Sequence, residues 1–140
     1  MRSKLKIVSV VLVVSILATI GYGFFQFNRA NKDLQGATAD IILPAITLVK
    51  EYSTNEAIAN KKFLNKIINV KGKIHSIERD SLANVTIFFE SDDPMSSVSC
   101  QLDKTHVDQA ARLHVGDSIS VVGMCTGFLT DVVLTRCSVE

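Results

Sequence analysis

The sequence predicts a mainly β fold with helices, in which a five-stranded barrel follows N-terminal helices and one apolar transmembrane helix. Three observations lead to this fold class. Residues 7–25 carry no charge, residues 38–66 repeat apolar side chains at helical spacing, and the apolar period changes to two from Ile67 onward. The later elements follow the order of three strands, one helix and two strands, which is the order of a closed five-stranded barrel.

The uncharged stretch 7–25 is long enough to cross a membrane, because about 20 apolar helical residues span a bilayer. Arg2, Lys4 and Lys6 precede it, so the positive-inside rule places the tail 1–6 in the cytoplasm. We therefore expect a single-pass signal-anchor, with the domain facing the periplasm or the cell exterior. A cleaved signal peptide is the alternative, although its apolar region usually runs about 7–15 residues and ends in an A-x-A-like site.

Charge is distributed unevenly along the chain, whose overall net charge is +1. All fourteen acidic residues but only eleven of the fifteen basic residues follow residue 30, which gives the exported part a net charge of −3. A mildly acidic domain lacks the basic surface that is typical of nucleic-acid-binding proteins.

The polar segment 26–36 ends in Gly36 and indicates a linker, so we expect the compact domain, with its N-terminal helical extension, to cover residues 37–140.

Two helices are expected at the start of this domain. Apolar spacing predicts the first over 38–50 and the second over 55–66, with Asn55 as the N-cap of the second. Pro44 would obstruct the first helix, so that helix either kinks there or begins near Leu43.

Five strands are expected from Ile67 onward. The first contains Gly72 and a phase slip before Ile77, which indicates a bulged and strongly bent strand. A helical segment over 104–113 separates the third strand from the fourth. The apolar positions that mark the later strands are Val85, Ile87 and Phe89; Val98, Cys100 and Leu102; Ile119, Val121, Gly123 and Cys125; and the run 132–139.

This order of elements is that of the OB-fold barrel. An open α+β sandwich is the alternative, but it would expose strand edges that closure of a barrel removes.

Three parts of the sequence carry a family resemblance. They are the stretch 59–74, the triplet Val98-Ser99-Cys100, and the segment 123–127 together with 131–134 and Cys137. In these parts the chain resembles the tRNA_anti-like family of OB-fold proteins, over roughly residues 40–140. The resemblance implies an OB fold in an exported or membrane-attached bacterial protein. The family name refers to a similarity of fold with anticodon-binding barrels and implies no particular activity.

Three cysteines suit the oxidising compartment that export implies. Alternation along the strands places Cys100, Cys125 and Cys137 inside the barrel, and the fifth strand of an OB barrel lies between the third and the fourth. We therefore expect one disulfide that involves Cys137. Cys125 is the expected partner, because a turn near Asp131 would set the two opposite each other, and Cys100 is the alternative partner. Three buried free thiols are the other possibility.

Nothing in the sequence carries a catalytic or metal-binding motif. His75, His106 and His114 have no cysteine or carboxylate at metal-ligand spacing and are interpreted as surface residues. The acidic pair in 92–94 is interpreted as turn chemistry, with calcium binding or catalysis as the alternative. We expect no enzyme activity, no metal and no cofactor.

Basic residues gather between the second helix and the first strand: Lys61, Lys62, Lys66, Lys71 and Lys73. Lys71 and Lys73 point outward from the strand and, with Phe88 and Phe128, form the candidate binding face. We expect an extracytoplasmic binding or interaction module with a protein or glycan partner. The alternative is a nucleic-acid-binding OB-fold protein that uses the lysines of 55–66 and the first strand, but the domain offers few outward rings on which bases could stack.

Overall fold

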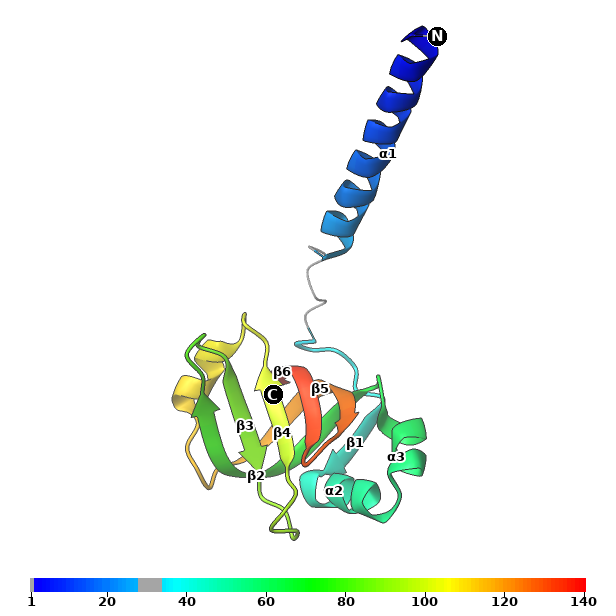
Figure 1. Ribbon diagram of the computed structural model, residues 1–140. Coiled ribbons are helices and arrows are strands. Elements are labelled where there is room, and N and C mark those ends of the chain that lie inside the picture. The colour runs from blue at the N-terminus through cyan, green and yellow to red at the C-terminus, as the bar shows by residue number, and fades with distance from the viewer. Residues whose placement is uncertain (1, 28–33) are drawn as a thin grey trace. The chain divides into compact units, whose positions relative to one another are not determined.

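The computed structural model describes residues 2–27 and 34–140, with side chains at 11–23 and 34–140. The chain divides into two compact units, Met1–Lys32 and Asp33–Glu140. The first unit contains a single helix of 26 residues, α1 (Arg2–Phe27), and the second contains the barrel (Figure 1).

The apolar side chains described on α1 lie on its surface. Val11, Leu17 and Ile20 are each about 60 % exposed. Among the residues described with side chains, no helix has both the length and the apolarity needed to cross a membrane. The span expected over 7–25 lies partly outside those residues.

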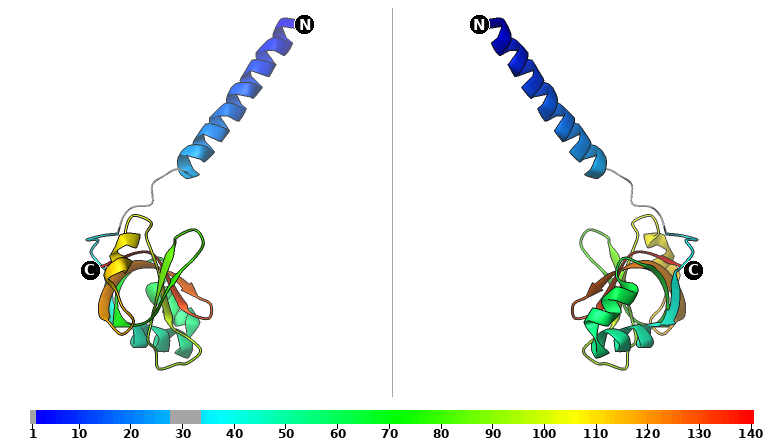
Figure 2. Two further views of the ribbon diagram at one scale, coloured as in Figure 1. Left: turned by 90° about the vertical axis from the view of Figure 1, so that its left-hand side faces the viewer. Right: turned by 90° about the vertical axis from the view of Figure 1, so that its right-hand side faces the viewer.

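The second unit is built around a closed barrel of five strands, seen end-on in Figure 2. The strands neighbour one another in the order β2-β3-β4-β6-β5, and β5 pairs again with β2. Among the five strands of the barrel, only β4 and β6 pair in parallel. This closure confirms the mainly β, five-stranded OB-fold barrel and excludes the open sandwich. The strands are β2 (Ile67–Arg79), β3 (Val85–Phe89), β4 (Val98–Leu102), β5 (Ser118–Phe128) and β6 (Val132–Val139).

Strand β2 is strongly bent, as expected, and takes part in two pairings. Its first half pairs with β5 and its second half with β3, with a register shift between Ile74 and Ser76. Gly72 lies at the bend, where an added Cβ would come within 2.8 Å of the Phe89 ring and 3.0 Å of the Ala45 Cβ. The absence of a side chain at position 72 therefore allows the helical extension to pack against the barrel.

The first half of the helix expected over 38–50 is a strand, and the alternative in which this helix begins near Leu43 is close to the structure. Strand β1 (Ile41–Pro44) pairs in parallel with the start of β2, and helix α2 (Ala45–Thr54) begins directly after it. Pro44 is extended, with φ −66° and ψ 147°. A residue before proline is also biased toward extended backbone, which favours a strand over 41–44.

Helix α3 (Glu56–Phe63) follows the expected break, and Asn55 is its N-cap as predicted. The Asn55 Oδ1 accepts a hydrogen bond from the Ile58 N–H at 3.1 Å. The helix ends three residues earlier than expected, and Asn65 has a positive φ of 61°. The segment expected to be helical over 104–113 contains a shorter 3₁₀ helix, η1 (Val107–Arg112).

The core fills the barrel and the space under α2 and α3. The largest fully buried side chains of this core include Tyr52, Phe63, Phe89, Leu48, Ile68, Ile74, Ile87 and Leu134. Leu34, which falls within the expected linker 26–36, is also buried, with 2 % of its surface exposed.

Candidate binding site

The outward side chains of the second half of β2 and of β3 and β4 form a surface that we call the outer face. Phe88 lies at its centre, opposite Ser76 on β2 and Ser99 on β4. It alternates with side chains of β3 that are buried in the core. The outer face consists of Ser76, Glu78, Thr86, Phe88 and Gln101, together with Ser99, which is only 9 % exposed. It combines hydroxyl and amide groups with one half-buried aromatic ring.

The loop 80–84, which joins β2 and β3, borders the outer face. Asp80 organises this loop by accepting hydrogen bonds from the backbone N–H groups of Leu82 (2.8 Å) and Asn84 (2.9 Å) and from the Asn84 amide (2.7 Å). These bonds, led by that from the Asn84 side chain, lower the pKa of Asp80. Leu82 stands at the tip of the loop with 81 % of its surface exposed.

Hydrogen bonds connect the loop 90–97 to the loop 129–131. The Asp131 Oδ1 accepts hydrogen bonds from the Ser97 N–H at 2.7 Å and from the Ser97 hydroxyl at 2.8 Å. The sequence placed Asp131 in a turn without assigning it a contact, and Asp80 was not identified from it. Their positions in Asp-containing loops between strands were the available signal.

Lys71 and Lys73 lie on the outside of the barrel, as expected, but they belong to the half of β2 that pairs with β5. They face Ser120 and Ser118 of that strand, whereas Phe88 neighbours the other half of β2. Lys73 also forms an ion pair with Glu90 at 3.1 Å. Lys71 therefore lies away from the β3-paired half of β2, whereas the Lys73 carbonyl accepts a hydrogen bond from the Glu90 N–H, next to the end of β3.

Phe128 is half-buried and packs against the core. Its ring stacks on Tyr52, with 5.6 Å between centroids and an interplanar angle of 21°. It also lines a groove of about 380 Å³ beside α3, together with Asn60 and Leu64. The prediction that Phe128 joins Lys71 and Lys73 on one binding face is not supported by this arrangement.

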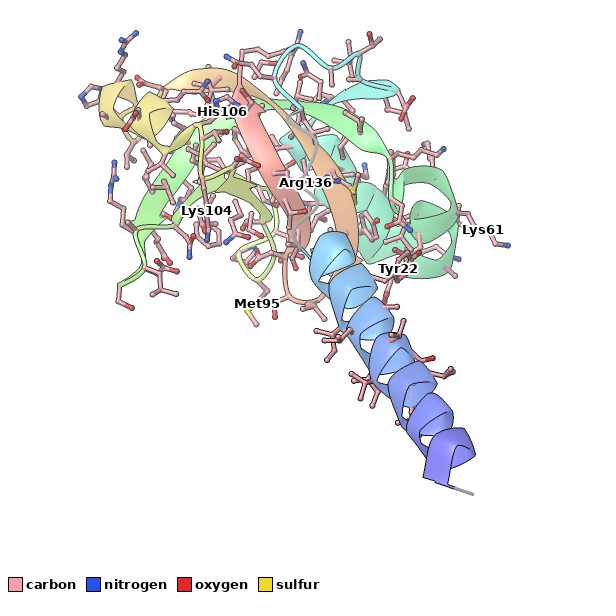
Figure 3. All side chains as sticks on the ribbon, turned by 90° about the horizontal axis from the view of Figure 1, so that it is seen from above. Tyr22, Lys61, Met95, Lys104, His106 and Arg136 are labelled. Carbon is pink, nitrogen blue, oxygen red and sulfur yellow. The ribbon has the colours of Figure 1, made fainter. Side chains whose placement is uncertain are left out.

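The lysines of α3 are separated from those of β2. Lys62 pairs with Glu51 at 3.0 Å and lies 5.1 Å from the centroid of the Phe63 ring. Lys61 projects away from α3 (Figure 3). The basic cluster of the sequence is thus divided between a helix surface and a strand surface, and part of its charge is neutralised by Glu51 and Glu90.

The three cysteines are all buried, as expected, and all are free thiols in the structure. The expected bond between Cys125 and Cys137 is absent because the register differs from the predicted one. Phe128 pairs with Val132, so the turn is centred at Thr130, and Cys125 lies opposite Leu134.

Each thiol has a different neighbour inside the barrel. The Cys125 Sγ lies 3.4 Å from the Tyr52 hydroxyl. Cys137 interacts instead with Cys100 across the β4–β6 pair. Burial, followed by this interaction, raises the pKa of the Cys137 thiol well above its usual value.

The histidines occupy three separate environments. His75 and His114 are exposed, and the His114 Nδ1 lies 3.6 Å from Asp117. His106 is 8 % exposed at the start of η1, so its interpretation as a surface residue is wrong. Its backbone N–H donates a hydrogen bond to the Asp103 carbonyl at 2.9 Å.

The acidic pair of the loop 90–97 shows the expected turn chemistry. The Asp93 Oδ1 accepts a hydrogen bond from the Met95 N–H at 2.9 Å, and the Asp93 N–H donates to the Ser91 hydroxyl at 3.1 Å. Within the described ranges, no group of three or more His, Cys, Asp or Glu side chains is arranged to hold a metal ion.

Comparison with known proteins identifies a family and a fold. The sequence profile of the tRNA_anti-like family matches residues 1–139. No curated protein matches the chain. Among solved structures, a proposed nucleic acid-binding lipoprotein from Klebsiella pneumoniae subsp. pneumoniae MGH 78578 is similar with a TM-score of 0.60 at 15 % identity, over 80 % of this chain and 99 % of that one. A proposed aspartyl-tRNA synthetase from Leishmania major Friedlin gives a TM-score of 0.47 at 11 % identity, over 80 % of this chain and 22 % of the synthetase.

Proposed function

The chain belongs to the tRNA_anti-like family, and from this membership we propose that it is a membrane-anchored OB-fold module that binds a protein or glycan partner outside the cytoplasm, without catalysis. The chemistry of the outer face carries the proposal. Its side chains offer hydroxyl and amide groups around the Phe88 ring, and Glu78 is its only charged member. OB barrels bind oligosaccharides as well as oligonucleotides on the corresponding strands.

A mostly uncharged face of this kind favours a partner that exchanges hydrogen bonds and packs against a ring. Thr86 and Gln101 lie opposite each other on neighbouring strands, close to Phe88. The hydrogen bonds of Asp80 hold the loop 80–84 in one conformation. The loop therefore loses little conformational entropy when a partner contacts the exposed Leu82.

Nucleic-acid binding is the second candidate function, because the proposed activity of the Klebsiella lipoprotein favours it. Affinity for nucleic acid depends largely on basic side chains that neutralise phosphates, together with rings on which bases stack. The outward residues of β3 and β4 include one ring and no lysine or arginine, Glu78 adds a negative charge from β2, and at the border Asp80 has Lys104 as a charged neighbour. This charge distribution ranks the second candidate below the first.

The anchor is proposed from the sequence of α1. Residues 7–25 carry no charge and follow three basic residues. A helix of 26 residues would be about 39 Å long at 1.5 Å per residue, enough to cross the hydrocarbon core of a bilayer. Membrane fractionation with mapping of the mature N-terminus tests this part. A mature chain that begins after residue 25 would replace the anchor by a cleaved signal.

A photo-crosslinking side chain placed at position 88 in intact cells tests the binding surface. We expect a crosslinked product that is unchanged by nuclease and that either becomes smaller after glycosidase treatment or yields peptides of a second protein by mass spectrometry. The matched control is the same side chain at Lys61, which projects from α3 and should give no product. A nuclease-sensitive product would establish the second candidate, and products from position 61 alone would reject the outer face.

A further inference from the structure

A cleft separate from the outer face lies between α2 and the loop 90–97. Figure 1 shows this loop and α2 at the same end of the barrel. The cleft has a volume of about 460 Å³, and α2 contributes Ile46, Val49 and Lys50 while the loop contributes Asp92 and Asp93. Small-molecule sites commonly measure about 300–1,000 Å³, so the cleft can hold a small ligand.

The side chains from α2 belong to one face of the helix, because positions i, i+3 and i+4 lie above one another. Val49 is buried and Ile46 is 42 % exposed, which gives the cleft an apolar floor. Lys50 continues the same face and is exposed. An apolar surface thus ends in a positive charge.

The opposite wall carries two carboxylates. The position of Asp93 is fixed by its hydrogen bonds with the Met95 N–H and the Ser91 hydroxyl, which leave its Oδ2 uncommitted among the described residues. Asp92 is exposed beside it. In the described part of the chain, Lys50 forms no ion pair with either aspartate within 4.0 Å. Opposite charges therefore border one cleft without neutralising each other.

We infer that this cleft binds a short zwitterionic peptide with an aliphatic side chain. The peptide ammonium lies against Asp92 and Asp93, its carboxylate against Lys50, and its aliphatic side chain on Ile46 and Val49. Each extended residue spans about 3.3–3.6 Å, so a dipeptide or tripeptide separates its two charged ends by more than the length of one ion pair.

Other ligand classes match the cleft less well. A nucleotide or another polyanion would meet the two aspartates. A neutral sugar would leave Lys50 and both carboxylates without charged partners while it removes water from them, which costs free energy. A peptide with both ends free satisfies the charges and the apolar floor together. The inference is independent of the function proposed for the outer face.

The probe is the tripeptide Ala-Leu-Ala, titrated into the full chain in mild detergent and followed by backbone amide NMR. We expect saturable shifts confined to residues 46–53 and 90–95. Acetylation of the peptide N-terminus or amidation of its C-terminus should each weaken binding by about tenfold or more, because each removes one charge-assisted hydrogen bond. Equal binding of the blocked peptides, shifts centred on another surface, or no saturation up to about 10 mM would overturn the inference.

Charge variants locate the contacts. The double variant Asp92→Asn/Asp93→Asn and the single variant Lys50→Gln should each weaken binding of the free tripeptide by about tenfold or more. The matched controls are Asp108→Asn and Lys61→Gln, exposed charges on η1 and α3, which should leave the dissociation constant unchanged. An amide spectrum that is unchanged away from the substituted residue shows that each variant is folded. Wild-type affinity in the folded cleft variants would overturn the inference.

Discussion

The sulfur of Cys137 lies over Gly123, so closely that a Cβ added to Gly123 would come within 2.5 Å of it. The arrangement arises from a bulge in β6. Val122 pairs with Ser138 and Met124 with Thr135, which leaves two residues of β6 opposite Gly123. Arg136 adopts a positive φ of 54° within this bulge, and the extra residue turns the side chain of Cys137 into the core.

The first prediction concerns this contact. Gly123→Ala should reduce the free energy of unfolding by about 1–3 kcal/mol, because the new methyl group overpacks the core against the Cys137 sulfur. Cys137→Ala removes that sulfur, so the double variant should lose less stability than the sum of the two single variants. Urea unfolding of the four proteins in a double-mutant cycle measures the difference. Additive effects would show that the sulfur is not the group that obstructs residue 123.

The second prediction concerns the thiols. Cys125 should remain free under oxidising conditions, since it lies opposite Leu134 and its sulfur is beside Tyr52. Any bond that forms should join Cys100 and Cys137, which interact across β4 and β6. Non-reducing peptide mapping after denaturation in an alkylating reagent identifies the pairing. A bond between Cys125 and Cys137 would contradict the observed register.

Local pattern was sufficient to predict most strands. The alternation of Val85, Ile87 and Phe89 matches β3, and the phase slip before Ile77 matches the shift in β2. The run 41–43 was ambiguous, because a short apolar run fits a helix or a strand until its pairing partner is known. That partner, the start of β2, lies more than twenty residues further along the chain.

The binding surface was harder to predict than the fold. Its position depends on which half of β2 each strand contacts, and this pairing separates Lys71 from Phe88. The disulfide prediction failed for a related reason. Arg136 has a positive φ, a conformation that favours glycine or asparagine. Because neither residue is present at position 136, the local sequence does not predict the bulge that shifts the register of Cys137.

The third prediction is a loss of stability at alkaline pH. Burial, followed by the hydrogen bond with Cys125, raises the pKa of Tyr52, and burial raises that of Cys137. Both groups stay neutral in the folded protein, whereas in the unfolded chain a thiol ionises near pH 8.5 and a phenol near pH 10. The stabilisation is therefore complete below about pH 8.5 and decreases as the pH rises above these values.

Urea unfolding at about pH 7, 9 and 10.5 measures this decrease. Tyr52→Phe should reduce the further loss above pH 10, because phenylalanine has no proton to release. Equal pH dependence of the variant and the wild type between the two higher values would exclude Tyr52 as a contributor.

The fourth prediction concerns the N-cap of α3. Asn55→Ala should lower the free energy of unfolding by about 1 kcal/mol, since the Ile58 N–H loses the Asn55 Oδ1 as its acceptor. Asn55→Asp keeps an acceptor at the helix N-terminus and serves as the matched control, with stability close to that of the wild type. Equal losses in both variants would mean that the cap contributes little.

The last prediction concerns nucleic acid. A labelled single-stranded oligonucleotide titrated into the full chain at about 150 mM salt should bind no more tightly than about 100 μM. The part of the chain after residue 30 has a net charge of −3, and the lysine cluster that the sequence suggested is divided between the α3 region and the first half of β2. Lys62 and Lys73 are already paired with Glu51 and Glu90. Any weak association at low salt should disappear as salt rises, because it rests on release of counterions rather than on stacking.

The double variant Lys71→Glu/Lys73→Glu should then leave binding unchanged at 150 mM salt, as should the control Lys104→Glu. A low-micromolar dissociation constant that is weakened by the β2 variant but not by the control would make nucleic-acid binding the function of this barrel.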